Sequence, residues 1–178
     1  MYLCRIRNPE QLKYINPGEF GKLLGLDRIP EAKCLRKKLK AICEQQRAEE
    51  WNMALAKTWS SEEENDFYYI DGHVQVYHGY QAQLGKKHVS RQRLCLPGVQ
   101  EFWVNNAEGM PYFYVCGQVN EKLQQMIGEE IVPKLLEEMP LQQDPDPDTA
   151  KLTIVFDREA YSPSFFDQLR NDHHVAVI

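Results

Sequence analysis

The clearest pattern of hydrophobic and polar positions lies between residues 67 and 77, where apolar side chains recur with a period of two. Successive side chains of a strand point to opposite faces, so this pattern predicts a half-buried β-strand. Ile70, Val74 and Val76 fall on one face. The opposite face carries an acid among polar and aromatic side chains: Tyr69, Asp71, His73, Gln75 and Tyr77.

Two further strands follow. Residues 93–105 contain the second, interrupted around Pro97-Gly98, and residues 110–119 contain the third. A hairpin turn at residues 106–109 joins the two. The pattern therefore predicts a three-stranded antiparallel meander.

The last third of the chain alternates helix and strand. Apolar side chains at four-residue spacing predict a helix at residues 121–139, kinked at Pro133 because proline removes one backbone hydrogen bond. Residues 152–156 are apolar on both faces, as expected for a central parallel strand, and Asp157 follows at its carboxyl end. A further helix and strand are predicted at residues 162–169 and 174–178.

The first 60 residues have a helical pattern. A short helix is predicted from Pro17 to Gly25, and a longer one at residues 31–59 carries apolar side chains at spacings of three and four. Its other faces are basic: Arg36, Lys37, Lys38 and Lys40. Two interpretations fit: DNA-backbone contact by a helix-turn-helix-like element, or a helical cap packed on the sheet that follows.

A polar, acidic stretch at residues 60–66 marks the best internal boundary. It separates a helical segment, residues 1–60, from a strand-containing domain, residues 67–178. Residues 1–58 carry 12 Lys and Arg against 7 Asp and Glu, a net +5, and residues 59–178 carry 9 against 19, a net −10. This uneven distribution of charge is expected if the first part contacts phosphates and the second part places carboxylates around metal ions. The alternative is that both sets of charges are ordinary solvated side chains.

Composition restricts the class of protein. No apolar run approaches the roughly 20 residues needed to span a bilayer, and the first residues lack the apolar core of a secretory signal. We therefore expect no membrane segment and a cytoplasmic location. The five cysteines are scattered and form no Cys-x-x-Cys pair, which favours small buried hydrophobes over a disulfide framework or a zinc site.

The order of elements predicts an α/β (α+β) fold: a mixed five-stranded sheet of the ribonuclease H-like type with flanking helices, preceded by the helical segment. In that fold the first and fourth strands are parallel neighbours joined by a right-handed crossover. Asp71 and Asp157 would then lie about 5 Å apart. A charge on a strand rich in Ile, Val and Tyr costs several kcal/mol to bury unless it is paired or bound to metal, so we expect the two acids to hold Mg²⁺ or Mn²⁺.

Four stretches of the chain resemble one family: residues 18–31, 69–77, 89–94 and 155–162 are similar to parts of bacterial insertion-sequence transposases of the Asp-Asp-Glu type. The resemblance implies a ribonuclease H-like domain that cuts and rejoins DNA by a two-metal mechanism. It matches Asp71 to the family's first acid and Asp157 to its second. It also implies action on transposon ends by an assembly of copies.

The third acid of that family, a Glu, lies on a helix after the fifth strand, whereas this sequence ends on that strand at Ile178. Two hypotheses follow: a truncated or fragmentary transposase, or a noncatalytic remnant that binds DNA or oligomerises. Glu159 is a poor substitute, because it lies in a turn and pairs locally with Arg158.

Other residues have supporting roles in this hypothesis. His73 contacts the scissile phosphate or a metal-bound water, or donates a hydrogen bond to Asp71, and Arg158 supports the acid beside it. The loop between the first two strands is expected to bring positive charge near the acids and contact DNA, unless it is only a solvated turn. Its candidate residues are Lys86, Lys87, Arg91 and Arg93, with Arg36, Lys37 and Lys40 of the N-terminal segment as a second set.

Overall fold

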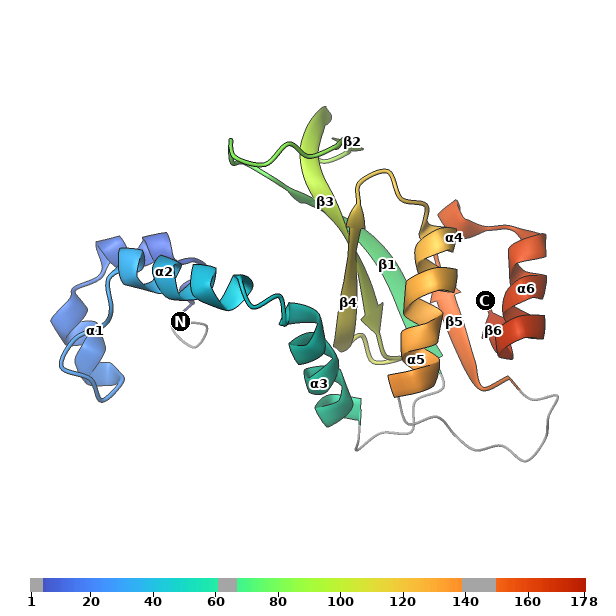
Figure 1. The fold of residues 1–178 in the computed structure, drawn as a ribbon, viewed down its shortest axis with the longest axis horizontal. Coiled ribbons are helices and arrows are strands. Elements are labelled where there is room, and N and C mark those ends of the chain that lie inside the picture. Colours follow the sequence, from blue (N-terminus) through green and yellow to red (C-terminus); the bar gives the residue numbers. More distant parts are fainter. Residues whose placement is uncertain (1–4, 61–66, 139–149) are drawn as a thin grey trace. The chain divides into compact units, whose positions relative to one another are not determined.

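The structure, a computed structural model, describes residues 5–60, 67–138 and 150–178 (Figure 1). The chain forms two compact units, residues 1–50 and 51–178, each with its own hydrophobic core. Most of the predicted linker at residues 60–66 and the acidic loop at residues 141–148 lie outside the described residues.

The first unit is helical, as predicted. Its elements are η2 (Pro9–Tyr14), α1 (Pro17–Leu23) and α2 (Ala32–Cys43). Asn16 caps α1, because its side-chain oxygen accepts hydrogen bonds from two backbone N–H groups that the helix leaves unpaired. The predicted stop at Gly25 is confirmed, and its φ of 70° is one that glycine adopts without strain. A small core holds the unit together: Ile6, Leu12 and Ile29.

The single helix predicted at residues 31–59 is wrong. Two helices, α2 and α3 (Ala48–Ser60), are separated by a break in which Gln46 has a φ of 54°. The apolar stripe of α2 stops at Ile42, and polar residues follow it. No buried side chain therefore stabilises a helical conformation at the break. Arg47 then donates to the Glu50 carboxylate at 2.8 Å in the first turn of α3.

Within the second unit, α3 packs on the sheet. Met53 and Ala56 are buried in the main core, and the Asn52 amide donates to the backbone oxygen of Tyr114 at 2.9 Å. For these residues the interpretation as a helical cap is the one the structure shows.

A mixed sheet forms the centre of the second unit. Its strands are β1 (Phe67–Val76), β2 (Lys86–Val89), β3 (Leu94–Asn105), β4 (Pro111–Gln118), β5 (Leu152–Phe156) and β6 (Val175–Val177). They are ordered β2-β3-β1-β5-β6, and β4 also pairs with β3. The predicted meander is confirmed, because β1, β3 and β4 are antiparallel neighbours, and β1–β5 and β5–β6 are parallel.

Two details of the sheet differ from prediction. The sheet has six strands rather than five, because residues 86–89, predicted as a loop, pair with the start of β3. The predicted break at Pro97-Gly98 is absent, and β3 continues through it. Both differences have the same cause. Strand β3 extends beyond the end of β1, and β2 pairs with an edge of β3 that would otherwise be free.

Helices cover one face of this sheet (Figure 1). They are α4 (Leu123–Met126), the π-helical turn η3 (Ile127–Ile131), α5 (Val132–Glu138) and α6 (Pro163–His173). The irregularity predicted at Pro133 takes the form of the π turn before it, since proline has no N–H to donate. The buried strand side chains share the face beneath these helices: Tyr68, Ile70, Phe102, Val104, Leu152 and Ile154. None of the helices in the described ranges has the length and apolar character needed to cross a bilayer.

Replacing Gly21 by Ala is expected to destabilise the first unit. A Cβ at this buried position would lie 2.6 Å from the Arg28 Cα, so the backbone must shift, at a cost of about 1–3 kcal/mol. Hydrogen exchange of residues 16–31 in the full chain should show faster exchange. Gly18→Ala is the control, because its Cβ meets only the Asn16 side-chain oxygen at 3.6 Å; equal exchange in the two variants would contradict the prediction.

Candidate active site

The pairing of β1 with β5 brings the two predicted acids together. The register pairs Tyr69 with Val155 and Ile70 with Phe156. The next residues are Asp71, still within β1, and Asp157, the first residue after β5. Residues matched in a parallel ladder point to the same face, and their strands lie about 4.8 Å apart. The prediction that the strand carrying Asp71 and the strand preceding Asp157 are parallel neighbours is therefore confirmed.

Both acids lie at the surface. Asp71 and Asp157 are exposed, and the Asp157 carboxylate accepts a hydrogen bond from the Arg158 N–H at 2.7 Å. Within the described ranges the Asp71 carboxylate has no hydrogen-bond or ion-pair partner. We expected Asp71 to be buried and therefore to need a cation that offsets the cost of burying its charge. That expectation is wrong, because the Asp71 carboxylate remains in water. What remains is a pair of neighbouring, solvated carboxylates.

Two carboxylates meet part of a magnesium ion's requirements. Mg²⁺ keeps several waters and is usually held by one or two carboxylates together with substrate phosphates. In the part of the chain that the structure describes, no group of three His, Cys, Asp or Glu side chains is placed to hold a metal. A divalent ion held by this pair would therefore need water and phosphate as its other ligands.

The acids lie on the face of the sheet opposite the helices, here called the open face. It is the face that carries Phe67, Tyr69, Asp71 and His73 of β1, Glu101 and Trp103 of β3, Tyr114 and Cys116 of β4, and Asp157. Phe67 and Tyr69 are each 42% exposed, whereas their neighbours Tyr68 and Ile70 are buried under the helices. The open face is thus a surface on which aromatic and acidic side chains lie together.

Sequence reasoning missed the aromatic part of the open face. Trp103 lies directly opposite Asp71 in the register of β1 and β3, and its ring stacks on that of Tyr114 with centroids 4.8 Å apart. The Trp103 indole N–H donates to the Glu101 carboxylate at 3.2 Å. The period-two pattern of β3 could have placed Trp103 on a face with Glu101, but not opposite Asp71, because cross-strand register depends on the fold.

His73 and Arg158 flank the acids without contacting them. His73 shares the face of Asp71, two residues along β1, and lies opposite Glu101. The alternative in which His73 donates a hydrogen bond to Asp71 is not seen among the described contacts. The predicted Arg158–Glu159 ion pair is also absent there, and both side chains are exposed. Both residues lie in one turn of 3₁₀ helix, η4 (Arg158–Ala160).

The predicted basic loop is far from the acids, which corrects the expectation that it lies beside them. Val89 of β2 pairs with Leu94, whereas Asp71 pairs with Trp103, so the two ends are roughly 30 Å apart along β3. The Lys87 ammonium donates to the Gln100 side-chain oxygen at 2.6 Å, a partly buried bond with a structural role. The exposed cations of this hairpin are Lys86, Arg91 and Arg93.

The candidate DNA-contacting residues of the first unit lie on the exposed surface of α2. Arg36 forms an ion pair with Glu10 at 3.1 Å, and Lys40 approaches Glu44 at 3.9 Å. Lys37 is exposed. Side chains in such solvated pairs exchange partners at little cost, so they remain able to contact phosphate.

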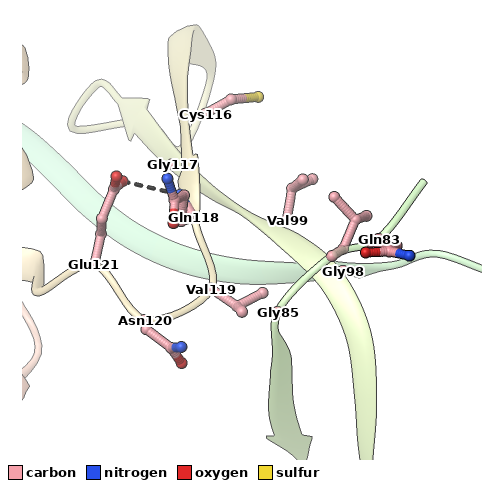
Figure 2. A pocket seen from close by; sticks show the side chains of 11 residues that line it. Gln83, Gly85, Gly98, Val99, Cys116, Gly117, Gln118, Val119, Asn120 and Glu121 are labelled. Atoms are coloured by element: carbon pink, nitrogen blue, oxygen red, sulfur yellow. Dashed lines mark hydrogen bonds between the residues drawn. The ribbon is translucent and has the colours of Figure 1, made fainter.

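A hollow of about 530 Å³ lies at the end of β4 (Figure 2). Its lining includes Val99, Cys116 and Gln118, and the Glu121 carboxylate accepts a hydrogen bond from the Gln118 N–H at 2.9 Å. Partial burial of the thiol raises the pKa of Cys116, and the negative charge of Glu101 opposite raises it further. A thiol held in its protonated form is a poor nucleophile, so Cys116 does not make this hollow a second catalytic site.

The expectation of buried cysteines is wrong for the four that the structure describes: Cys34, Cys43, Cys95 and Cys116 are exposed. Cys34 and Cys43 lie on α2, of which the first core covers only one side. Cys95 and Cys116 lie on β3 and β4, where side chains alternate between the covered and the uncovered face.

The Cys116 thiol is expected to react with iodoacetamide more slowly than the Cys95 thiol at pH 8. Only the thiolate reacts, and a raised pKa lowers the thiolate fraction at a fixed pH, so the alkylation rate of Cys116 should rise only at higher pH. Glu101→Gln removes the nearby charge and should speed alkylation of Cys116 but not of Cys34. Mass spectrometry of the alkylated peptides between pH 7 and pH 10, roughly the range in which thiols titrate, measures both rates. Equal pH profiles for Cys116 and Cys95 would contradict the prediction.

Comparison with known proteins gives one match. A family model described as "Transposase protein" matches residues 1–177, nearly the whole chain. Searches of curated proteins and of solved structures give no significant match. Because the family model covers both units, including the strands that carry Asp71 and Asp157, the chain belongs to this family of transposases.

Proposed function

We propose that the protein is a transposase of the insertion-sequence, Asp-Asp-Glu type that cleaves and rejoins DNA with Asp71 and Asp157 as two of its metal-binding acids. The observation that carries the proposal is the β1–β5 register, whose last matched pair, Ile70 with Phe156, immediately precedes the two acids. An antiparallel meander followed by two parallel strands supports a ribonuclease H-like domain. Membership of a transposase family supports DNA as the substrate.

In this proposal each residue of the site has one task. Asp71 and Asp157 together hold Mg²⁺ or Mn²⁺ and so position a DNA phosphate over the open face. When bound, a pair of such ions supplies activation of the attacking hydroxyl and stabilisation of the leaving oxygen. His73, on the same face as Asp71, and Arg158, beside Asp157, lie where each can donate a hydrogen bond to the phosphate.

DNA beyond the reacting phosphate is held by exposed cations. We assign Lys86, Arg91 and Arg93 of the β2–β3 hairpin, and Arg36, Lys37 and Lys40 of α2, to contact with the phosphate backbone at the transposon end. Lys87 contributes less, because its ammonium is bonded to Gln100. Such contacts add affinity without reading sequence.

A second candidate function is a noncatalytic remnant that binds DNA or oligomerises. It is favoured by the finding that no third metal ligand joins the acids in the described ranges. Leu39 and Ile42 on α2, 49% and 62% exposed, are apolar side chains that a second copy could cover. The two candidates differ in whether the acid pair binds metal.

Asp71→Asn and Asp157→Asn are each expected to lower Mn²⁺ affinity at least about tenfold, since even second-sphere partners of a metal commonly change affinity by that factor. Mn²⁺ titration followed by electron paramagnetic resonance measures the affinity directly, with or without DNA. Asp167→Asn, an exposed acid on α6, is the matched control and should leave affinity unchanged. If wild type and all three variants bind Mn²⁺ equally, the metal site does not exist and the noncatalytic function is favoured.

Arg91→Gln is expected to weaken binding to duplex DNA and to reduce the slope of log affinity against log salt by about 0.9, the value for one lost phosphate contact. Fluorescence anisotropy between about 50 and 200 mM salt gives the slope. Lys151→Gln removes an exposed cation at the start of β5, away from the hairpin, and serves as the control. The hairpin assignment fails if both variants keep the wild-type slope.

A further inference from the structure

Four side chains form one row across the open face. Asp157 directly follows β5, as Asp71 follows the last β1 residue paired with that strand. Trp103 on β3 lies opposite Asp71, and Tyr114 on β4 lies opposite Trp103. Neighbouring strands are about 4.8 Å apart, so the row runs from two carboxylates directly onto two aromatic rings. The rings of Trp103 and Tyr114 stack at an interplanar angle of 29°.

The Trp103–Tyr114 pair does not belong to the hydrophobic core. The strand residues of that core come from the face beneath the helices, including Phe102 and Val104 on either side of Trp103. Trp103 and Tyr114 are half-buried, on the face that also leaves Phe67 and Tyr69 exposed. A cross-strand aromatic pair contributes to stability, but stability alone does not require it beside the acids.

Both rings are held in place before any ligand arrives. The bond from the Trp103 indole N–H to Glu101 fixes the indole, and the Asn52 bond to the Tyr114 backbone oxygen anchors that residue of β4 to α3. Burial raises the pKa of Tyr114, and the charges of Cys116 and Glu101 add to the shift, so the phenol is neutral at physiological pH. The pair is therefore a rigid, uncharged aromatic surface.

We propose that Trp103 and Tyr114 form a stacking platform for an unpaired nucleobase of the DNA strand whose phosphate lies at Asp71 and Asp157. The inference rests on the proposed function for the identity of that strand. Aromatic rings bind bases of any sequence by stacking, whereas a base inside a duplex already stacks on its neighbours. The platform adjoins the acids, so the stacked base belongs to the nucleotide at or next to the reacting phosphate. Trp103 is thus a positioning residue that favours unpaired or distorted DNA at the cleavage point.

The test uses single-stranded oligonucleotides with one 2-aminopurine, whose fluorescence falls when the base stacks on an aromatic ring, and matched oligonucleotides with an abasic position. Binding is measured with the full chain without added metal. Wild type should quench 2-aminopurine and bind the abasic strand about tenfold more weakly. Trp103→Leu should lose both effects, and Trp103→Phe should restore most of them. Trp51→Leu, at a 68% exposed tryptophan on α3, should match wild type.

If Trp103→Leu fails to fold, the wild-type protein alone still tests the proposal. Equal binding of intact and abasic strands by wild type, with unchanged fluorescence, would overturn it. Loss of self-association in Trp103→Leu with unchanged DNA binding would assign the pair to a protein interface and overturn it as well. Mn²⁺ titration of Asp71→Asn tests the proposed function separately. If quenching depends on Trp103 but no metal site is found, the stacking platform stands and the proposed cleavage chemistry fails.

Discussion

The parallel hydrogen-bond ladder between β1 and β5 is the constraint on which the rest of the structure depends. Four matched pairs, from Phe67 with Thr153 to Ile70 with Phe156, fix the alignment of two segments that lie more than 80 residues apart in the sequence. A slip of one residue would turn Asp157 toward the helices and Phe156 toward water, because side chains alternate with a period of two. Burial of Leu152 and Ile154 beneath the helices opposes that slip. The core thus holds the two acids together although neither acid belongs to it.

The two faces of the sheet have different roles. The covered face supplies the hydrophobic free energy of folding through a single core that also includes Leu123, Ile131 and Leu169 of the helices. The open face is free to carry side chains that a core would exclude, among them Asp71, Glu101 and Asp157. The acids remain in water, so the charge that the proposed metal binding needs is held without the desolvation penalty that the interior would impose.

Much of this fold could be predicted from the sequence, because alternation along β1, the apolar run of β5 and the spacing in α4–α5 each reflect burial that the fold does impose. The break at residues 44–47 could not be placed from helical periodicity, since residues on both sides of it keep spacings of three and four. Strand β2 was missed because Lys86 and Lys87 carry no strand pattern, and its pairing depends on the length of β3. The acid pair could be predicted because the order of elements makes the strand of Asp71 and the strand before Asp157 neighbours. The neighbourhood of Trp103, in contrast, depended on a cross-strand register that no local pattern encodes.

Strand β3 connects the two surfaces assigned to DNA, and its length has a consequence for how much DNA the protein covers. The rise per residue of an antiparallel strand, about 3.4 Å, is nearly the same as the rise per base pair of B-form DNA. From Trp103, opposite the acids, to Leu94, at the hairpin end, the strand therefore spans roughly nine base pairs. That is close to one helical turn of 10–10.5 base pairs, so a duplex lying along β3 would present the same side of its backbone at both places. In the proposed function, a transposon end bound at both places would therefore be covered over at least roughly nine base pairs.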